Sequence, residues 1–263
     1  MMYEIQTYLG ADGLMHCTVC KEPVEAFYPK GSLLEMREHH RQCACERKAH
    51  AEEAQYYKEK EHRELIARNK KICFEEKEME GFTFQNVERD SGVIRIAEEY
   101  VTNWQKMKQN HMGYLFWGPV GTGKSYLATC IANALLEKEV TVKMTNFNTI
   151  LNDLFAAEDK TEYIRPLNGY EFLIIDDLGV ERSSEYALEN IFSVIDWRYR
   201  SGKPLIITTN LPLAQLKQET KIEKKRIYDR ILERCIPVKI DGVSRREAMA
   251  NDNMQTMKNI LKI

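Results

Sequence analysis

The chain has 263 residues, enough for one large domain or two modest ones. Hydrophobic residues make up 43% of it and charged residues 30%, the composition of a soluble protein that can form a core. No apolar run approaches the roughly 20 residues that cross a bilayer, and a net charge of −2 excludes a strongly basic chain. Residues 1–10 show no secretory signal. We therefore expect a cytoplasmic protein without membrane contact, whose cysteines stay reduced.

The first predicted element is a cysteine-rich module. Cys17 and Cys20 are separated by two residues, and Cys43 and Cys45 by one. Zinc binds four thiolates in a tetrahedron, and two short cysteine pairs on separate turns can supply them. We predict a structural zinc site with all four cysteines as ligands; four free thiols in a small helical cap are the alternative. His39 and His40 are close enough to replace one cysteine, and His16 is adjacent to the first pair.

A long charged helix is expected next. Between Glu46 and Glu80 more than half of the residues are charged, none is Pro or Gly, and opposite charges recur at helical spacing. The first interpretation is a solvated linker helix, and a partner-binding helix is the alternative. These features predict a zinc-binding module at residues 1–48, the linker helix at 49–80 and a nucleotide-binding domain at 81–263.

The rest of the chain alternates between predicted helices and strands. After Gly81 we expect an extended stretch, Phe82–Asn86, and then a helix, Gly92–Lys108. Apolar runs predict five strands, at Tyr114–Trp117, Val140–Met144, Phe172–Ile175, Leu205–Thr208 and Pro237–Ile240. Helices are predicted between them, at Lys124–Lys138, Thr149–Ala157, Ser184–Arg200 and Glu223–Cys235. This alternation predicts an α/β fold, with a five-stranded parallel sheet and helices on both faces.

A phosphate-binding motif follows the first of these strands. It reads Gly118-Pro119-Val120-Gly121-Thr122-Gly123-Lys124-Ser125, the pattern G-x-x-x-x-G-K-[ST], and Tyr126 comes next. Glycines let backbone N–H groups face a β-phosphate, and the following helix directs its positive dipole end at the same anion. Lys124 would contact the β- and γ-phosphates, and the Ser125 hydroxyl would hold Mg²⁺. The strand before and the helix after favour ATP or GTP binding over a turn that binds nothing.

Polar side chains also end two later strands. Asp176 and Asp177 follow the run Phe172–Ile175, and Asn210 follows the next strand along the chain. Asp176 suits a Mg²⁺ ligand, and Asp177 suits the carboxylate that polarises an attacking water. Asn210 could position that water, although asparagine is also a common strand-exit residue.

Arginines cluster toward the end of the chain. Arg226, Arg230 and Arg234 are spaced to lie on one face of a predicted helix. The default interpretation is a solvated basic face; the functional one is an arginine that enters a neighbouring subunit's active site and stabilises phosphate charge. Arg245 and Arg246 follow Gly242-Val243-Ser244, and one of them could touch the γ-phosphate of the same chain.

As an ordered set, these motifs resemble the AAA+ ATPases of the DnaC/DnaI helicase-loader and IstB group, over about residues 82–250. GPVGTGKS resembles Walker A, LIIDDLG resembles Walker B, ITTN resembles sensor 1, and GVSRR resembles a terminal G-x-S-x-R. The resemblance implies that the helical lid of most AAA+ proteins is missing. It also implies individual roles: Asp177 at the catalytic base position, where Glu is more common, Asn210 as sensor 1, Arg230 as arginine finger with Arg226 and Arg234 as alternatives, and Arg246 as sensor 2.

The same resemblance implies a function. The N-terminal module would bind a hexameric DnaB-family replicative helicase, ATP binding would assemble the AAA+ modules into a homo-oligomer, and single-stranded DNA would be threaded through. Slow, DNA-stimulated ATP hydrolysis would release the helicase, with ATP, Mg²⁺ and Zn²⁺ as cofactors. Two alternatives stay open: an IstB-like transposase helper ATPase acting on duplex DNA, and a nucleotide-gated adaptor with negligible turnover. The segment after the second strand, which includes Lys143, Asn146, Phe147 and Asn148, could contact DNA. A core Phe147 beside an exposed Lys143 is the alternative, so no DNA-contacting residue is assigned.

Overall fold

The computed structural model describes residues 6–26, 31, 39–86, 92–179, 184–242 and 244–261. Within these ranges, the side chains of Arg245, Ala248 and Met249 are not described. The chain forms two compact units, Met1–Leu65 and Ile66–Ile263. Within the described ranges, no helix combines the length and apolar character that crossing a membrane requires.

The first unit contains two short antiparallel ribbons. Strand β1 (Thr7–Leu9) pairs with β2 (Met15–Cys17), and β3 (Glu25–Ala26) pairs with β4 (His39–His40). The described side chains buried here form a very small cluster of Cys17, Val24 and Cys43. A segment with so little apolar burial needs another source of stability, such as a metal.

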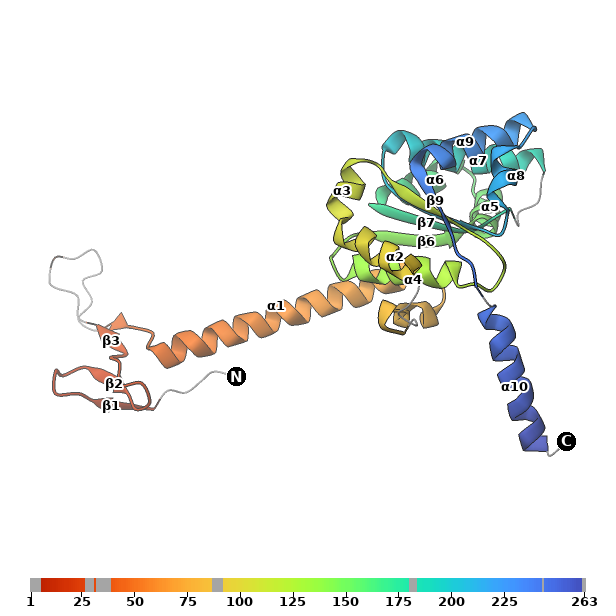
Figure 1. The fold of residues 1–263 in the computed structure, drawn as a ribbon. Helices are drawn as coiled ribbons and strands as arrows, with labels where there is room; N and C mark the ends of the chain where they lie inside the picture. Colours follow the sequence, from red (N-terminus) through yellow and green to blue (C-terminus); the bar gives the residue numbers. More distant parts are fainter. Residues whose placement is uncertain are drawn as a thin grey trace. The chain divides into compact units, whose positions relative to one another are not determined.

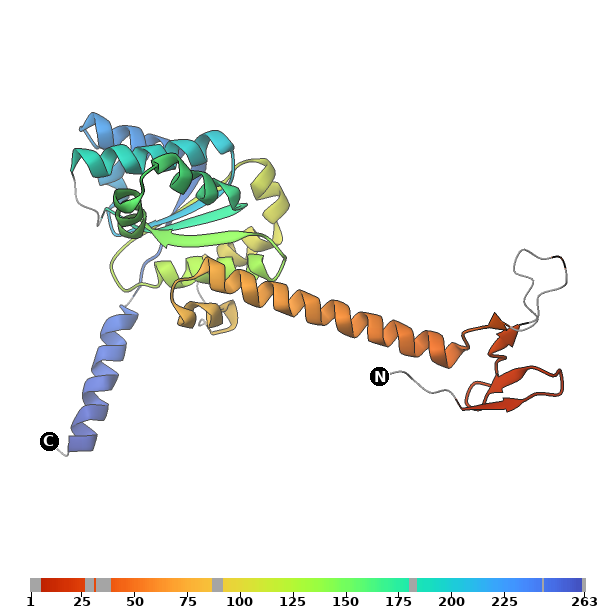
Figure 2. The same cartoon turned by 180° about the vertical axis from the view of Figure 1, so that it is seen from behind.

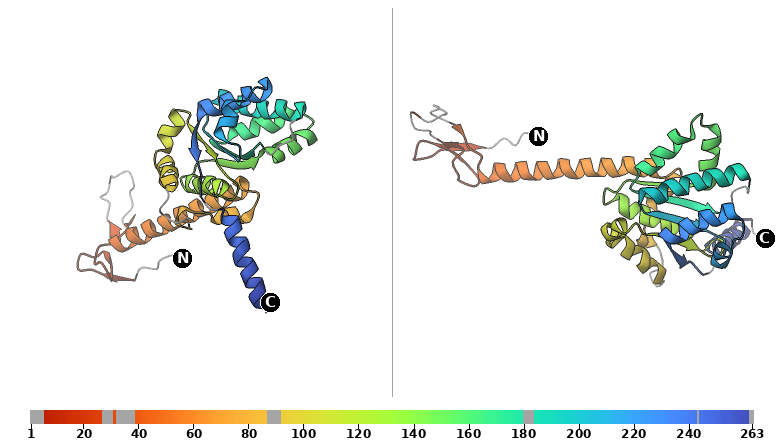
Figure 3. Two further views of the ribbon diagram at one scale, coloured as in Figure 1. Left: turned by 45° about the vertical axis from the view of Figure 1, so that its right-hand side comes forward. Right: turned by 90° about the horizontal axis from the view of Figure 1, so that it is seen from above.

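Helix α1 (Ala44–Cys73) begins in the first unit and is unbroken in both views of Figure 3. The predicted charged helix is confirmed, but its predicted continuation to Glu80 is wrong. It ends at Cys73 because Cys73 and Phe74 are buried in the core of the second unit. The predicted extended stretch Phe82–Asn86 is also wrong in part, because a 3₁₀ turn occupies Phe84–Asn86 after another at Lys77–Gly81.

The second unit is built on a five-stranded parallel sheet, as predicted. Its strands are β5 (Gly113–Trp117), β6 (Val142–Asn146), β7 (Phe172–Leu178), β8 (Leu205–Thr209) and β9 (Cys235–Lys239). Their spatial order is β6-β7-β8-β5-β9. Strands β7, β8 and β5 are therefore neighbours, and because they are parallel, their carboxyl ends meet at one edge of the sheet.

Helices cover both faces of this sheet (Figures 1 and 2). One face carries α2 (Gly92–Thr102), α3 (Trp104–Gln109) and α4 (Lys124–Leu136). The other carries α5 (Phe147–Ala156), α6 (Lys160–Gly169), α7 (Glu185–Ser201), α8 (Leu213–Lys217) and α9 (Ile222–Arg234). Side chains alternate between the two cores along each strand, so that Phe172 and Ile174 face the first group while Leu173 and Ile175 face the second. Helix α10 (Arg245–Leu261) follows β9.

Four features of the helices differ from the prediction, and the first is α10, which no predicted element covers. The helix expected at Gly92–Lys108 is divided at Asn103, whose side-chain amide donates to the Glu99 carbonyl and competes with the helical bonding. Helix α6 was not predicted, because Pro166 and Asn168 interrupt its helical pattern. Helix α8 was not predicted either, since five residues are too few to show a period.

Candidate functional site

The phosphate loop joins the carboxyl end of β5 to α4. Gly118 has a φ of 146°, and a Cβ there would lie 2.2 Å from the Ile240 carbonyl oxygen. Gly121 has a φ of 82°, and a Cβ there would lie 2.3 Å from the Ser244 hydroxyl. Only glycine fits these two positions, so the loop closely contacts the segment that follows β9.

Lys124 lies at the first position of α4 and is only 5% exposed. Its ammonium donates to the carbonyls of Gly118 at 3.0 Å and Pro119 at 2.7 Å. Burial lowers the pKa of Lys124, while the nearby carboxylates of Asp177 and Asp176 oppose that shift. A bound phosphate would replace neutral carbonyl partners with charge-assisted ones.

Asp176 lies beside the phosphate loop, as predicted from its place at the end of a strand. The Ser125 hydroxyl donates to its Oδ1 at 2.9 Å, and the Thr208 hydroxyl donates to the same oxygen. Burial raises the pKa of Asp176, and these two hydrogen bonds act against that rise. Ser125 and Asp176 thus bring two hard oxygen donors together, which is the donor set that Mg²⁺ requires.

Asp177 has a left-handed backbone, with φ at 57°. A bulge in β7 between Ile175 and Leu178 produces this turn, and the Asp177 N–H donates to the Thr208 hydroxyl at 3.0 Å. The side chain is exposed at the carboxyl edge of the sheet. Such strain in a non-glycine residue persists only where surrounding bonds hold it. The position of Asp177 suits a carboxylate that faces solvent beside a bound phosphate.

Asn210 directly follows β8 and is half-buried. Thr209, the residue before it, is in register with Leu178 of β7, so Asn210 lies at the same edge as Asp177.

Tyr126 packs elsewhere: its ring stacks on Phe82 with centroids 4.5 Å apart. Thr208, which holds both aspartates, was not predicted, because a threonine in a strand is ordinary.

The segment after β9 returns to the phosphate loop. Ser244 packs against Gly121, and its hydroxyl accepts a hydrogen bond from the Glu247 N–H at 3.3 Å. The charge of Arg246 acts at Lys124, where it helps to lower the lysine pKa. The predicted sensor 2 arginine is therefore close to the phosphate site. Val243 and the side chain of Arg245 lie outside the described residues.

The three predicted arginines of α9 share one face, as their spacing predicted. Arg226 and Arg230 stack on Phe192, with distances of 4.2 and 4.5 Å from Cζ to the ring centroid. Arg234 stacks on Tyr199 at 4.6 Å. The structure does not bring any of them to the phosphate loop of the same chain, because α9 leads into the amino end of β9.

The four predicted cysteines come together in the first unit. The sulfur atoms of Cys17, Cys20, Cys43 and Cys45 all lie within 4.8 Å of one another. A hydrogen bond from the Glu22 backbone lowers the pKa of Cys20 to about 6, whereas burial raises the pKa of Cys43 and raises that of Cys45 to about 11. Four sulfur donors at this separation fit a structural zinc ion.

Two histidines near these cysteines have carboxylate partners. His16 Nε2 bonds to the Asp12 carboxylate at 2.9 Å. His40 Nε2 lies 2.9 Å from Glu46 Oε1. Neither belongs to the cluster of sulfur atoms that the described residues form. The cysteine-only ligand set is therefore the one that the geometry favours.

Lys143 and Phe147, considered as DNA contacts, are structural. Phe147 is buried in the core, and the Lys143 ammonium donates to the Ile72 carbonyl at 3.1 Å. An exposed aromatic pair lies elsewhere: Phe155, at the end of α5, is 81% exposed and meets Tyr186 edge to face. The Lys160 ammonium lies 4.6 Å from the centre of the Tyr186 ring. No periodicity marks these residues, because the fold alone brings α5, α6 and α7 together.

Comparison with known proteins agrees with this arrangement. The chain is 27% identical over 149 residues to the "Replicative helicase loader DnaC" of Escherichia coli K12, covering 55% of this chain and 58% of that protein. It is 23% identical over 192 residues to the "Replicative helicase loader DnaI" of Bacillus subtilis 168, covering 67% and 62%. The chain thus spans less than two thirds of the length of these curated relatives.

Solved structures show the same fold. A crystal structure of DnaI superposes with a TM-score of 0.58 at 24% identity, over 68% of this chain and 99% of that one. A crystal structure of the DnaC helicase loader gives 0.54 at 21% identity, over 63% and 100%. The family model described as "IstB-like ATP binding protein" matches residues 46–252, most of the chain. The chain therefore belongs to the family of IstB-like ATP-binding proteins.

Proposed function

We propose that this protein is an ATP-dependent loader that places a hexameric DnaB-family replicative helicase on single-stranded DNA. ATP binding drives side-by-side assembly of the AAA+ modules into a homo-oligomer, and slow, DNA-stimulated hydrolysis releases the helicase. The observation that carries this proposal is the contact of Ser125 with Asp176 beside Lys124, in a family whose matched relatives are named helicase loaders.

The nucleotide site supplies the switch. Lys124 and the loop N–H groups bind the phosphates; Ser125 and Asp176 would hold Mg²⁺, which would neutralise phosphate charge during transfer. Asp177 orients the attacking water and accepts its proton, while Asn210 fixes the position of that water. Arg246 contacts the γ-phosphate from the same chain. An arginine of the α9 face, for which the sequence names Arg230 first, completes the site from a neighbouring subunit.

The first unit supplies the helicase contact. Its four cysteines would hold a zinc ion, which would stabilise a module with almost no apolar core. Two apolar side chains of this unit are exposed, Leu9 at 70% and Val19 at 71%. Such residues on a small, rigid module suit a protein partner.

The aromatic pair at the end of α5 supplies a contact for single-stranded DNA. Phe155 leaves most of its side chain exposed to solvent. Phe155 meets Tyr186 edge to face, and the Lys160 ammonium, 4.6 Å from the centre of the Tyr186 ring, adds positive charge. Bases of a single strand stack on such rings without sequence preference, while the cation attracts the phosphate backbone.

The family description favours one alternative, an IstB-like transposase helper that acts on duplex DNA. The two functions differ in partner and in the form of DNA. Purified protein carrying its zinc is incubated with the host replicative helicase, or with duplex or single-stranded DNA. Capture of the helicase with preference for single strands supports the loader. Failure to bind the helicase, together with a preference for duplex DNA, contradicts it.

The rate of phosphate release tests whether the phosphate-loop site hydrolyses ATP. The wild-type protein and Lys124→Ala are compared with and without single-stranded DNA. We expect DNA-stimulated release that is lost in Lys124→Ala. Equal release from both proteins would exclude this site as an ATPase and leave the nucleotide-gated adaptor.

A further inference from the structure

Helix α10 is not covered by any described part of the chain. It follows β9 and runs for 17 residues, Arg245–Leu261. Every residue from Ala250 to Leu261 is exposed, so nothing among the described residues packs on these turns. Helices of a few turns are marginal in water on their own, because most helical stability in proteins comes from the packing of an apolar face. A stable α10 therefore needs a surface to pack against.

One side of α10 is apolar. Ala250, Met254, Met257 and Leu261 are spaced by four, three and four residues, which places them in one stripe along the helix. The three larger side chains of this apolar stripe are each more than half exposed, and Ile260 beside them is 71% exposed. This arrangement is typical of a helix that buries one face against a partner.

The charge of these turns excludes a nucleic acid as that partner. Between Ala250 and Leu261 the helix carries one acidic residue, Asp252, and one basic residue, Lys258, so its net charge is zero. Proteins bind a phosphate backbone through several Lys and Arg side chains, and these turns have only one. The apolar stripe therefore suits an apolar surface of a protein.

The beginning of α10 lies at the nucleotide site. Ser244, directly before the helix, packs against Gly121 of the phosphate loop. The charge of Arg246, in the first turn, acts at Lys124. The last three turns extend from there by only about 16 Å. The partner of the apolar stripe must therefore lie next to the phosphate loop, which is where a neighbouring subunit completes the site in the proposed function.

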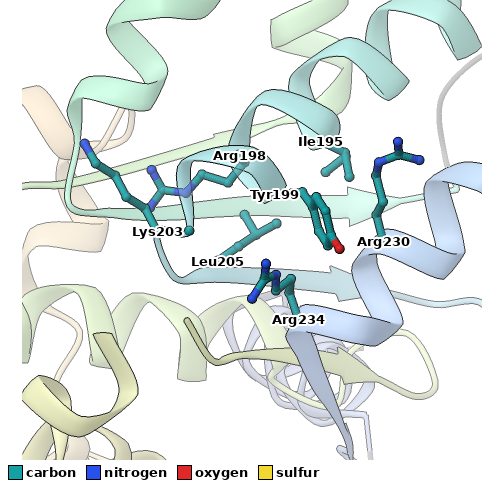
Figure 4. A pocket seen from close by; sticks show the side chains of 8 residues that line it. Ile195, Arg198, Tyr199, Lys203, Leu205, Arg230 and Arg234 are labelled. Carbon is teal, nitrogen blue, oxygen red and sulfur yellow. The ribbon is translucent and has the colours of Figure 1, made fainter. Parts of the chain in front are cut away.

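A second copy of the chain has surfaces that can receive this stripe. The pocket in Figure 4 is unsuitable, because four cationic side chains line it: Arg198, Lys203, Arg230 and Arg234. Covering such charges with methionine side chains would remove their water without replacing its hydrogen bonds. Other parts of the second unit expose large apolar side chains, including Trp197 at 41%, Ile222 at 62% and Ile236 at 49%. Contact with side chains of this kind would remove apolar surface from water on both copies.

We propose that the apolar stripe of α10 docks on the second unit of another copy of this chain, so that α10 joins neighbouring subunits beside a bound nucleotide. The inference rests on the proposed function, in which ATP binding assembles the AAA+ modules side by side. It assigns to α10 the role of an assembly contact.

Sedimentation of the zinc-bound protein, with and without ATP, tests this contact. The double variant Met254→Glu/Met257→Glu places two charges on the apolar stripe. We expect ATP-dependent association of the wild type and association at least about tenfold weaker in this variant, because a carboxylate is costly to bury in an apolar contact. Nucleotide affinity should be unchanged, since the phosphate loop is intact, and retained affinity also shows that the variant is folded.

Gln255→Glu/Asn259→Glu is the matched control, because it adds the same charge to the opposite side of α10. It should associate like the wild type. Equal association of the two double variants, whether strong or weak, overturns the inference. Normal association of the stripe variant with loss of helicase capture also overturns it, since the helicase would then be the partner of α10. A wild-type protein that binds ATP without associating overturns the assembly step of the proposed function, and the inference with it.

Discussion

At the scale of single residues, the candidate site depends on a threonine. Thr208 donates to Asp176 and accepts from the Asp177 N–H, so one hydroxyl holds the metal-binding carboxylate and the strained backbone of its neighbour. Nothing in a strand such as Leu205–Thr209 distinguishes this threonine from one that only fills space. The aspartates themselves were predictable, because acidic residues at the end of a buried strand are unusual.

Replacing Thr208 by valine removes this hydroxyl while keeping the side-chain shape. We expect Thr208→Val to lose about tenfold in phosphate release, since Asp176 and Asp177 would no longer be held in position. Nucleotide affinity should change less, because Lys124 and the loop remain. Thr208→Ser keeps the hydroxyl and should stay near the wild-type rate. Equal rates for the valine and serine variants would contradict the role given to the hydroxyl.

The exposed aromatic pair gives a second prediction at this scale. Phe155→Ala should weaken binding of single-stranded DNA by about tenfold, the worth of one stacked base. Stability should change little, because the ring is 81% exposed. Phe155→Trp retains a stacking surface and should retain affinity. Fluorescence anisotropy with a labelled oligonucleotide measures the DNA affinity of both variants. Unchanged affinity in the alanine variant would place the DNA contact elsewhere.

At the scale of elements, the sheet was more predictable than its connections. The five strands are continuous apolar runs, as burial on both faces requires, and the strand predictions were off by at most three residues at an end. The end of α1 was not predictable, because it depends on distant partners. The Asn133 side chain of α4 donates to the carbonyls of Met79 and Phe82, and so holds a 3₁₀ path that local sequence does not specify.

Arg198 is a further case in which tertiary contacts decide the role of a residue. In the sequence it is one of several basic residues at the end of a helix. In the structure its guanidinium is buried and donates to the carbonyls of Tyr170, Glu171 and Pro204, which joins α7 to the starts of β7 and β8. Burial lowers its pKa to about 9. Arg198 therefore stabilises the sheet.

Substitution of Arg198 should consequently destabilise the second unit. Arg198→Ala leaves three backbone carbonyls unsatisfied and creates a cavity, so we expect a loss of about 3 kcal/mol in the free energy of unfolding. Arg200→Ala, two residues on, is largely exposed and should change that free energy by less than about 1 kcal/mol. Urea unfolding of the two variants measures the difference; similar values would contradict the structural role of Arg198.

At the scale of the whole molecule, the two units have different sources of stability. The second unit has two extensive hydrophobic cores, whereas the first buries little besides its cysteines. We therefore expect that only the first unit needs a bound metal in order to fold. The spacing of the cysteines predicted this site, but only the structure shows that the sulfur atoms converge while His16 and His40 have carboxylate partners.

Replacing Cys17 and Cys20 by serine should abolish zinc binding, measured as metal content per chain. Nucleotide affinity should be unchanged, because the phosphate loop lies in the other unit, but helicase capture should be lost. His40→Ala is the control, since His40 pairs with Glu46, and it should bind zinc like the wild type. Unchanged zinc content in the double cysteine variant would refute the ligand set.

The central claim is that nucleotide binding at Lys124 drives the placement of a helicase on single-stranded DNA. The most direct measurement is helicase loading onto a circular single strand, with and without ATP, by the zinc-bound wild-type protein and by Lys124→Ala. We predict ATP-dependent loading by the wild type and none by Lys124→Ala. Helicase loading that is the same without ATP, or the same with Lys124→Ala, would contradict the account.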